Sequence, residues 1–317
     1  MKSIRICLSV AELDSAFEEM VSKLSAIAEI DTVGLSFFSL SGYDIFIGKK
    51  LTKEALDGAD RLKAVFAYKT GVDDFPIDAL YERGIVLVNS HIDADYIAEY
   101  AMALSFALTS RIIECDKKLR RGIWYDIQNP YWKSIYSMKF GLLGYGHIGQ
   151  AIHGMLMQNN IPAATLDRGR QYCNIEALPS LERLCDECDI IIASLPKTEK
   201  TDDLFDKEML SHLKGKYIVN VGRSNCINEE ALYEALRDGE LAGAAIDTWD
   251  EKPKSKNQVL APSKYPLSEL DNVILSPHRA MFVSDGHLRY VRDITRKVSD
   301  YILDGTVSDT VDLKKGY

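Results

Sequence analysis

Short apolar runs alternate with longer amphipathic segments along most of the chain. Runs rich in Val, Ile and Leu are typical of buried strands, and segments of about 10–15 residues with helical period separate them. In the second half, strands are expected within 139–146, 163–167, 189–196, 216–222, 243–249 and 272–278, with helices within 147–160, 178–188, 201–213 and 228–240. This order predicts βαβ units and a parallel sheet with helices on both faces.

The first hundred residues show a second, smaller alternation. Strands are expected within 5–10, 32–38, 44–48, 62–68 and 84–89, with helices within 12–28 and 78–84. One long helix over 94–122 leads into the second half, and a helix over 286–305 is expected to return to the first. The fold class is therefore α/β, with two Rossmann-like doubly wound domains.

The same pattern predicts a discontinuous domain organisation. A nucleotide-binding domain is expected over 102–288, and a substrate domain over 1–101 and 289–317. Because ligands favour interdomain crevices and the carboxyl ends of strands, the substrate is expected in a cleft between the domains.

A G-x-G-x-x-G motif follows the first strand of the larger half and opens a helix. Gly144 allows a tight turn, Gly146 lets the backbone approach a pyrophosphate, and Gly149 lets helix and strand pack closely. Asp167, at the end of the next strand, is placed to bind both ribose hydroxyls and to repel a 2′-phosphate, which favours NAD over NADP. Arg168 follows directly and weakens that preference, because a guanidinium can pair with a phosphate.

Composition narrows the function further. The 317 residues carry a formal charge of −9, which argues against a nucleic-acid partner. No apolar run approaches the ~20 residues of a membrane helix, and the N-terminal residues lack a signal-peptide pattern, so a cytoplasmic protein is expected. Among the six cysteines, Cys185 and Cys188 form C-x-x-C; a redox or metal pair and two packed helical residues are the alternatives, and no metal site is expected.

Several segments, in order, resemble the NAD-dependent D-isomer-specific 2-hydroxyacid dehydrogenase family over nearly the whole chain. They are 69–89, 97–104, 141–152, 194–205, 219–249 and 272–278. The resemblance implies an oxidoreductase that transfers a hydride between NAD(H) and a small 2-oxo or 2-hydroxy acid, usually as a homodimer. A catalytically weak NAD(H)-sensing binding protein on the same fold is the alternative.

Two residues carry the expected chemistry. Arg223 follows a strand, where the family keeps an arginine, and a guanidinium can bind a carboxylate through two hydrogen bonds. His278 follows the last strand, and an imidazole suits proton donation to the forming alkoxide near neutral pH.

The resemblance assigns further roles residue by residue. His147 and Ile148 would meet the pyrophosphate through their backbone, and Asp247 would bond the carboxamide. The nicotinamide side would be lined by Leu195, Pro196 and Val221. The backbone of Lys69, Thr70 and Gly71 would hold the substrate carboxylate; the side chain of Lys69 either binds a second anionic group or points to solvent.

The histidine's usual glutamate partner is replaced in this chain. Aligning Asp247 and Pro253 with the family places Lys252 there, and a charged lysine cannot accept an imidazole N–H. Three possibilities follow: Glu251, Asp250 or a neutral group partners His278; Lys252 binds a substrate anion; or turnover is lost.

The aromatic segment before the nucleotide strand contains Trp124, Tyr131 and Trp132. A dimer arm and a simple buried loop are the two alternatives for it.

Overall fold

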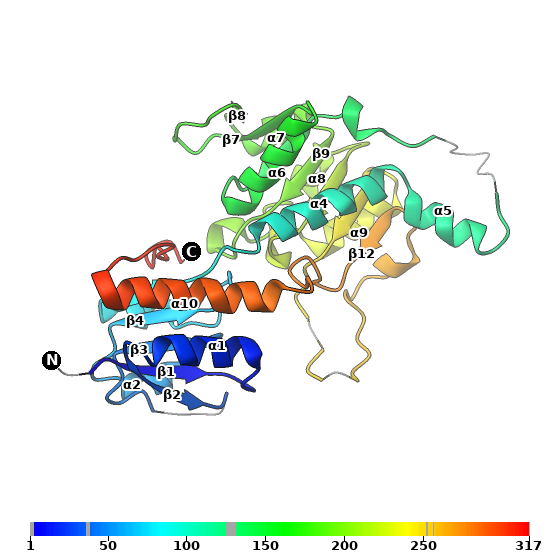
Figure 1. The fold of residues 1–317 in the computed structure, drawn as a ribbon. Coiled ribbons are helices and arrows are strands. Elements are labelled where there is room, and N and C mark those ends of the chain that lie inside the picture. Colours follow the sequence, from blue (N-terminus) through cyan, green and yellow to red (C-terminus); the bar gives the residue numbers. More distant parts are fainter. Residues whose placement is uncertain (1–2, 36–38, 125–130, 252, 256, 317) are drawn as a thin grey trace. The chain divides into compact units, whose positions relative to one another are not determined.

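The computed structural model describes residues 3–35, 39–124, 131–251, 253–255 and 257–316. The chain divides into two compact units: unit 1 comprises Met1–Asp93 and Phe282–Tyr317, and unit 2 comprises Ala94–Met281. Each unit is a parallel sheet flanked by helices (Figure 1), which confirms the expected α/β class. The unit boundaries lie several residues before those predicted near 101 and 288, and the expected cleft stays a prediction.

Unit 1 contains a five-stranded sheet in the order β2-β1-β3-β4-β5, with every neighbouring pair parallel. The strands are β1 (Arg5–Ser9), β2 (Glu29–Val33), β3 (Ile45–Gly48), β4 (Ala64–Ala67) and β5 (Val86–Val88); the helices are α1 (Ser15–Leu24), α2 (Lys53–Asp57), α3 (Ile77–Glu82) and α10 (Gly286–Asp304). Successive strand side chains point to opposite faces. Ile6 and Leu8 therefore pack in the core that α1 and α10 cover, whereas Cys7 packs in the core of the other face.

Unit 2 contains a seven-stranded parallel sheet in the order β12-β11-β10-β9-β6-β7-β8. The strands are β6 (Phe140–Leu143), β7 (Ala163–Leu166), β8 (Glu176–Leu178), β9 (Ile190–Ala193), β10 (Tyr217–Asn220), β11 (Gly243–Ile246) and β12 (Val273–Leu275). Strand order reverses between β9 and β6, which makes this the switch point where ligands of open α/β sheets bind.

Helices cover both faces of the unit 2 sheet, as the continuous apolar strands require. They are α4 (Ala94–Thr109), α5 (Ile112–Leu119), α6 (His147–Gln158), α7 (Leu181–Glu187), α8 (Lys207–Ser211) and α9 (Glu229–Arg237), with short 3₁₀ turns at Ile135–Ser137, Glu199–Thr201, Ser224–Cys226 and Leu267–Glu269. Side chains of α4 and α6 pack in one core of the sheet, and those of α7 and α9 pack in the other. None of the helices in the described part of the chain has the length and apolar character needed to cross a membrane.

The single long helix expected over 94–122 is two helices. Residue Arg111, between α4 and α5, adopts φ 58°, a left-handed conformation that ends the first helix although no glycine or proline is present. Its guanidinium hydrogen-bonds Glu114 in the first turn of α5. A tertiary and side-chain effect, invisible to a periodicity argument, therefore divides the segment.

Smaller differences have similar causes. The expected helix over 201–213 begins at Lys207, because Asp206 caps it by accepting from the N–H of Met209 at 2.9 Å. The strand expected over 32–38 is β2 at Glu29–Val33, and residues 36–38 lie outside the described part. The sequence did not predict the short elements α2 and β8, each of five residues or fewer.

Candidate active site

The predicted site residues of unit 2 follow the carboxyl ends of six parallel strands, which meet at one edge of the sheet; Asp247 directly follows β11. Gly144 follows β6, Asp167 follows β7, and Leu195 follows β9. Arg223 lies three residues after β10, and His278 lies three residues after β12. Neighbouring strands are about 4.8 Å apart, so the two strand ends that present the guanidinium and the imidazole are separated by about 10 Å, with β11 between them.

The glycine-rich turn is packed as its sequence predicts. Gly144 has φ 100°, and a Cβ there would lie 2.9 Å from the carbonyl oxygen of Ser194. A Cβ on Gly149 would lie 2.1 Å from the carbonyl oxygen of Gly144, so α6 can approach the turn only with glycine at this position. Gly146 differs, because no atom of the described residues lies within 4 Å of the position that a Cβ would take there.

The N-terminus of α6 fits a bound phosphate. Its N-cap is Gly146, no side chain caps it, and its first turn contains no acid. By contrast, five other helices begin with a side-chain cap, namely Asp14, Thr52, Ser180, Asp206 and Asn228. An uncapped helix leaves its first N–H groups and the positive end of its dipole open to an anion. His147 is exposed and Ile148 is half-buried at this end of the helix.

The predicted ribose-binding end of the site is exposed. Asp167 accepts the N–H of Gly169 at 2.8 Å through one carboxylate oxygen. Arg168 is also exposed, and Arg170 lies over the rings of Tyr145 and Tyr172 at 5.9 Å and 5.2 Å. Both an acid that favours ribose hydroxyls and guanidinium groups that favour phosphate therefore lie at the end of β7.

The loop that carries Arg223 is held by a buried amide. Asn220 is 1% exposed; its oxygen accepts the N–H of Gly222 at 3.0 Å, and its NH₂ donates to the carbonyl of Arg223 at 2.9 Å. The thiol of Cys226 donates to the same carbonyl at 3.2 Å. Because both lone pairs of that carbonyl are engaged, the backbone of Arg223 is fixed while its side chain stays half-buried.

The loop that carries His278 is held by a buried carboxylate. Asp247 is 1% exposed and accepts the N–H of Arg279 at 2.8 Å, the N–H of Ala280 at 3.1 Å, and the hydroxyl of Ser276. This loop turns at His278, which adopts φ 56°. The resemblance assigned Asp247 to the carboxamide, and the structure adds a second task, since both of its oxygens organise the histidine loop.

Two further side chains support the same loop and were not singled out from the sequence. The hydroxyl of Tyr100 lies 2.9 Å from that of Ser276, and donates to it because the Ser276 proton goes to Asp247. The indole N–H of Trp249 donates to the carbonyl of Ser276 at 2.8 Å. The sequence signal for Tyr100 and Trp249 was a side chain with a polar group within an apolar helix or strand. It could not identify their partner, because Ser276 lies more than twenty residues away from each in sequence.

The nicotinamide-side residues contact one another through backbone. Leu195 and Val221 are buried and Pro196 is half-buried. A Cβ on Gly222 would lie 2.6 Å from the backbone nitrogen of Leu195, so the segments after β9 and β10 touch at this point.

The structure does not join His278 to the acids proposed as its partner. Glu251 is exposed and makes no hydrogen bond or ion pair with any residue that the structure describes. Asp250 accepts the hydroxyl of Ser224 at 2.6 Å instead. Lys252 lies outside the described residues, so its predicted place beside the histidine stays a prediction.

The Lys69–Gly71 loop belongs to unit 1 and follows β4. The ammonium of Lys69 pairs with Asp74 and lies 5.6 Å from the ring centroid of Phe75, so this side chain does not simply point to solvent. The backbone N–H of Thr70 donates to the hydroxyl of Tyr290, whereas within the described part of the chain no acceptor is found for the backbone N–H of Gly71. The Gly71 donor fits the predicted carboxylate-binding role of the loop.

The C-x-x-C pair belongs to the apolar core. Cys185 and Cys188 are at most 1% exposed, and burial raises the pKa of each thiol to about 12. Because the thiolate is the reactive form, these thiols are unsuited to redox or metal chemistry at neutral pH.

Residues 102–280, more than half of the chain, match the family described as D-isomer specific 2-hydroxyacid dehydrogenase, NAD binding domain. The chain belongs to this family. It is therefore an NAD(P)-dependent oxidoreductase of the 2-hydroxyacid dehydrogenase class, and the part of unit 2 that carries the glycine turn is its NAD-binding domain.

Individual relatives agree with this assignment. A glyoxylate reductase from Thermofilum pendens is 32% identical over 241 residues, which cover 73% of this chain and 69% of that protein. A solved structure from Pyrococcus horikoshii is 26% identical, covers 98% of this chain and 96% of its own, and superposes with a TM-score of 0.82. An NADPH-dependent glyoxylate/hydroxypyruvate reductase from Sinorhizobium meliloti, in complex with NADP and malonate, shares the fold at 22% identity and a TM-score of 0.78, over 99% of this chain and 98% of its own.

The glycine turn generates the first prediction. Gly149→Ala is expected to abolish NAD(H) binding, measured by quenching of protein fluorescence, because its Cβ would displace the phosphate-binding turn from α6. Gly154→Ala on the same helix is the matched control, since a Cβ there meets nothing within 4 Å. The control should bind NAD(H) normally and gain about 0.5–1 kcal/mol from helix propensity. Equal binding by both variants would contradict the proposed packing.

Proposed function

We propose that this protein reduces a small 2-oxo acid to the corresponding D-2-hydroxy acid with NADH, in the manner of a glyoxylate reductase. The observation that carries the proposal is the placement of Arg223 and His278 after two strands of one parallel sheet, each on a loop fixed by a buried polar side chain. The similarity to the Thermofilum pendens glyoxylate reductase supports glyoxylate as the first substrate to test, and the Sinorhizobium meliloti glyoxylate/hydroxypyruvate reductase suggests hydroxypyruvate as the second.

The proposed chemistry uses few groups of the chain. The guanidinium of Arg223 binds the substrate carboxylate and polarises the carbonyl oxygen. When bound, the dihydronicotinamide supplies the hydride to the carbonyl carbon. The electron pair of the C=O bond moves to oxygen, and protonated His278 donates a proton there. The loop at Lys69–Gly71, through the N–H of Gly71, is proposed to hold the same carboxylate, and unit 1 is accordingly proposed as the substrate domain.

The partner of His278 is not assigned to Asp250 or Glu251 in this proposal. Asp250 is engaged by Ser224, and Glu251 has no contact that would orient an imidazole. The left-handed turn held by Asp247 orients the histidine through its backbone instead.

NAD is proposed as the cofactor in preference to NADP. Asp167 retains a carboxylate oxygen for the ribose hydroxyls, and a carboxylate repels a 2′-phosphate. Arg168 acts in the opposite direction, which is relevant because the Sinorhizobium meliloti relative binds NADP.

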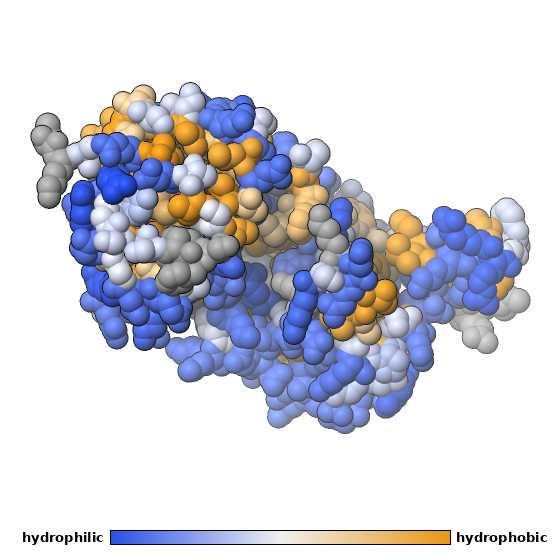
Figure 2. All heavy atoms as spheres, turned by 90° about the horizontal axis from the view of Figure 1, so that it is seen from below, coloured by the Kyte–Doolittle hydropathy of each residue, from blue (hydrophilic) through white to orange (hydrophobic). Residues whose placement is uncertain are grey.

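A homodimer is proposed for the assembly. Trp124, Tyr131 and Trp132 are 75%, 83% and 61% exposed, so these three side chains are not buried against the rest of the described chain. Ile112, Ile113 and Leu119 add exposed apolar surface on α5. Figure 2 shows apolar atoms among polar ones at the right-hand edge, where α5 lies in Figure 1. Exposed apolar surface of this kind marks protein interfaces.

Catalytic variants test the activity. With glyoxylate and NADH, His278→Ala and Arg223→Ala are expected to lower kcat/KM by about 10²–10⁴-fold, because each removes a group that acts in the transition state. The dissociation constant for NADH should stay within about twofold. Glu251→Ala and the surface control His212→Ala, whose ring pairs with Asp186, should retain activity.

Two outcomes would contradict the activity proposal. One is a wild-type protein for which none of the 2-oxo acids tested supports NADH oxidation, although NAD raises its melting temperature; this result would favour a sensing role. The other is His278→Ala with unchanged kcat/KM.

Cofactor preference is tested by two neighbouring variants. Wild type is expected to show a higher kcat/KM with NADH than with NADPH. Asp167→Ala should lower kcat/KM for NADH by about 10–100-fold, since hydrogen bonds to a charged group are lost. Arg168→Ala should lower only the activity with NADPH. A wild-type preference for NADPH would overturn the assignment.

Assembly is tested by size-exclusion chromatography with light scattering. The wild type should have the mass of two 35.6 kDa chains. Replacing Trp124 and Trp132 together by Ser should shift the equilibrium toward a single chain, while Tyr81→Ser, at an aromatic position of unit 1 that is 50% exposed, should not. A wild-type monomer at micromolar concentration would remove the proposal.

A further inference from the structure

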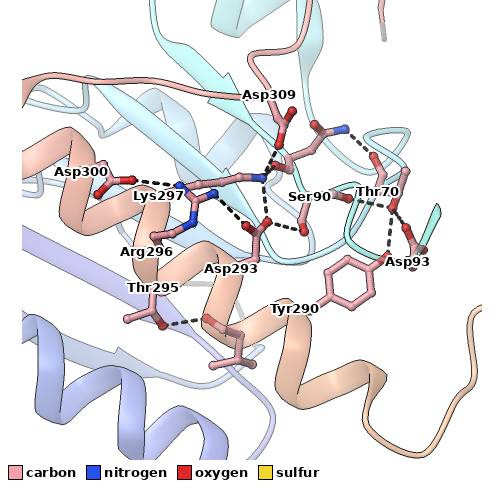
Figure 3. Close-up of polar contacts among 12 residues, drawn as sticks. Thr70, Ser90, Asp93, Tyr290, Asp293, Thr295, Arg296, Lys297, Asp300 and Asp309 are labelled. Atoms are coloured by element: carbon pink, nitrogen blue, oxygen red, sulfur yellow. Dashed lines mark hydrogen bonds and ion pairs between the residues drawn. The ribbon is translucent and has the colours of Figure 1, made fainter. Parts of the chain in front are cut away.

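A buried ammonium group lies at the centre of a polar cluster in unit 1 (Figure 3). Lys297 of α10 is 2% exposed, and its three N–H donors match three acceptors. These are Asp293 at 2.7 Å, Asp309 at 2.6 Å and the backbone carbonyl of Asn89 at 2.8 Å. A buried lysine is normally tolerated only with such complete pairing, so its neighbours are held in fixed positions.

The cluster continues from Lys297 to the segment after β5. Ser90 is fully buried, and its hydroxyl donates to Asp293 at 2.7 Å. Burial disfavours the charged form of Asp293, but hydrogen bonds from Lys297 and Ser90 outweigh burial and lower the pKa of Asp293. Arg296 also contacts Asp293, at 3.0 Å, from the more exposed side of α10. The lysine therefore fixes both Asn89 and Ser90 against the helix.

A second arm of the cluster reaches Thr70. Its hydroxyl lies 2.8 Å from the carbonyl of Ser90, 2.7 Å from a carboxylate oxygen of Asp93 and 2.9 Å from the hydroxyl of Tyr290. Burial, followed by the charge of Asp93, raises the pKa of Tyr290, so this hydroxyl keeps its proton. Tyr290 thus links the Lys69–Gly71 loop directly to α10.

The cluster also sets the direction of the peptide groups in the loop. The carbonyl of Lys69 accepts the N–H of Ser90 at 3.2 Å, and the carbonyl of Thr70 accepts the side-chain NH₂ of Asn89 at 2.7 Å. These peptide bonds are trans, and in a planar trans peptide the N–H points opposite to the C=O. The Thr70 N–H hydrogen-bonds Tyr290, and drawing the Thr70 carbonyl toward Asn89 turns the Gly71 N–H to the opposite side.

We propose that the Lys297–Asp293–Ser90 chain and Tyr290 are positioning elements for substrate binding, which fix the peptide groups of residues 69–71 so that the Gly71 N–H is available to the substrate carboxylate. This inference rests on the proposed function of the loop. The cluster touches no reacting atom and acts only through the peptide orientation of residues 69–71.

The test uses variants that leave the buried ion pair in place. Removing Lys297 leaves Asp293 and Asp309 without their cation and is expected to unfold unit 1. Tyr290→Phe and Ser90→Ala instead each remove one hydroxyl from the links to the loop. In the full-length protein, each is expected to raise KM for glyoxylate about five- to tenfold, with kcat at saturation and the dissociation constant for NADH within about twofold. KM rises and kcat stays unchanged when an interaction with the substrate carboxylate is lost equally in the ground state and the transition state.

The matched control is Arg296→Gln. Arg296 contacts one carboxylate oxygen of Asp293, and Ser90 donates to the other. Its KM should match wild type. Hydrogen–deuterium exchange gives a readout that needs no turnover: the peptide containing residues 69–72 should exchange faster in Tyr290→Phe and Ser90→Ala, but not in Arg296→Gln.

The outcomes separate the two proposals. An inactive wild type sinks the proposed function, while the exchange measurement still decides the positioning role. Unchanged exchange in both hydroxyl variants, or an unchanged KM in an active enzyme, overturns the positioning role. A lower melting temperature with unchanged KM identifies the cluster as purely structural.

Discussion

The unit 2 site depends on one buried carboxylate. Asp247 accepts hydrogen bonds from two consecutive backbone N–H groups and from a hydroxyl. A buried carboxylate must find donors, because an unsatisfied charge costs several kcal/mol in the protein interior. The segment after β12 supplies these donors only if it turns back over the end of β11. That turn carries His278 in a left-handed conformation, which costs about 1 kcal/mol for a residue other than glycine. The hydrogen bonds that Asp247 gains from this turn therefore offset the conformational strain of His278, the proposed proton donor.

Both units use the same physical device. In unit 2, Asn220 and Asp247 fix the loops after β10 and β12 through their backbone. In unit 1, Lys297 fixes the segment after β5, which in turn holds the loop after β4. In each case a side chain that is at most 2% exposed binds the main chain of a loop and leaves other groups of that loop available. A polar group that is buried and satisfied is more rigid than one in water, so it suits the placement of ligand-binding groups to a fraction of an ångström.

Sequence patterns predicted the sheets, the glycine turn and the strand ends that carry Arg223 and His278, because these depend on local period and on βα connections. They did not predict the break at Arg111, since a left-handed arginine stabilised by Glu114 has no periodic signature. They also missed Lys297 as a buried cation, because a lysine within an amphipathic helix is normally exposed and its partners Asn89 and Asp309 are distant or follow the helix. The role expected for Glu251 stays a prediction, because one-dimensional spacing does not determine which way a turn directs its side chains.

Two sets of backbone donors remain open in a protein whose other helix starts are often capped. The first turn of α6 lacks a side-chain cap, and the Gly71 N–H has no acceptor within the described part of the chain. A missing cap costs about 1 kcal/mol of stability, so these donors are a cost in the free protein. Ligands that supply the missing acceptors recover that energy only in the folded state, so they bind and stabilise at once. The phosphates of a dinucleotide match the first set and a carboxylate matches the second, and the two sets belong to different units. Binding of each proposed ligand is therefore expected to order the unit that supplies its donors.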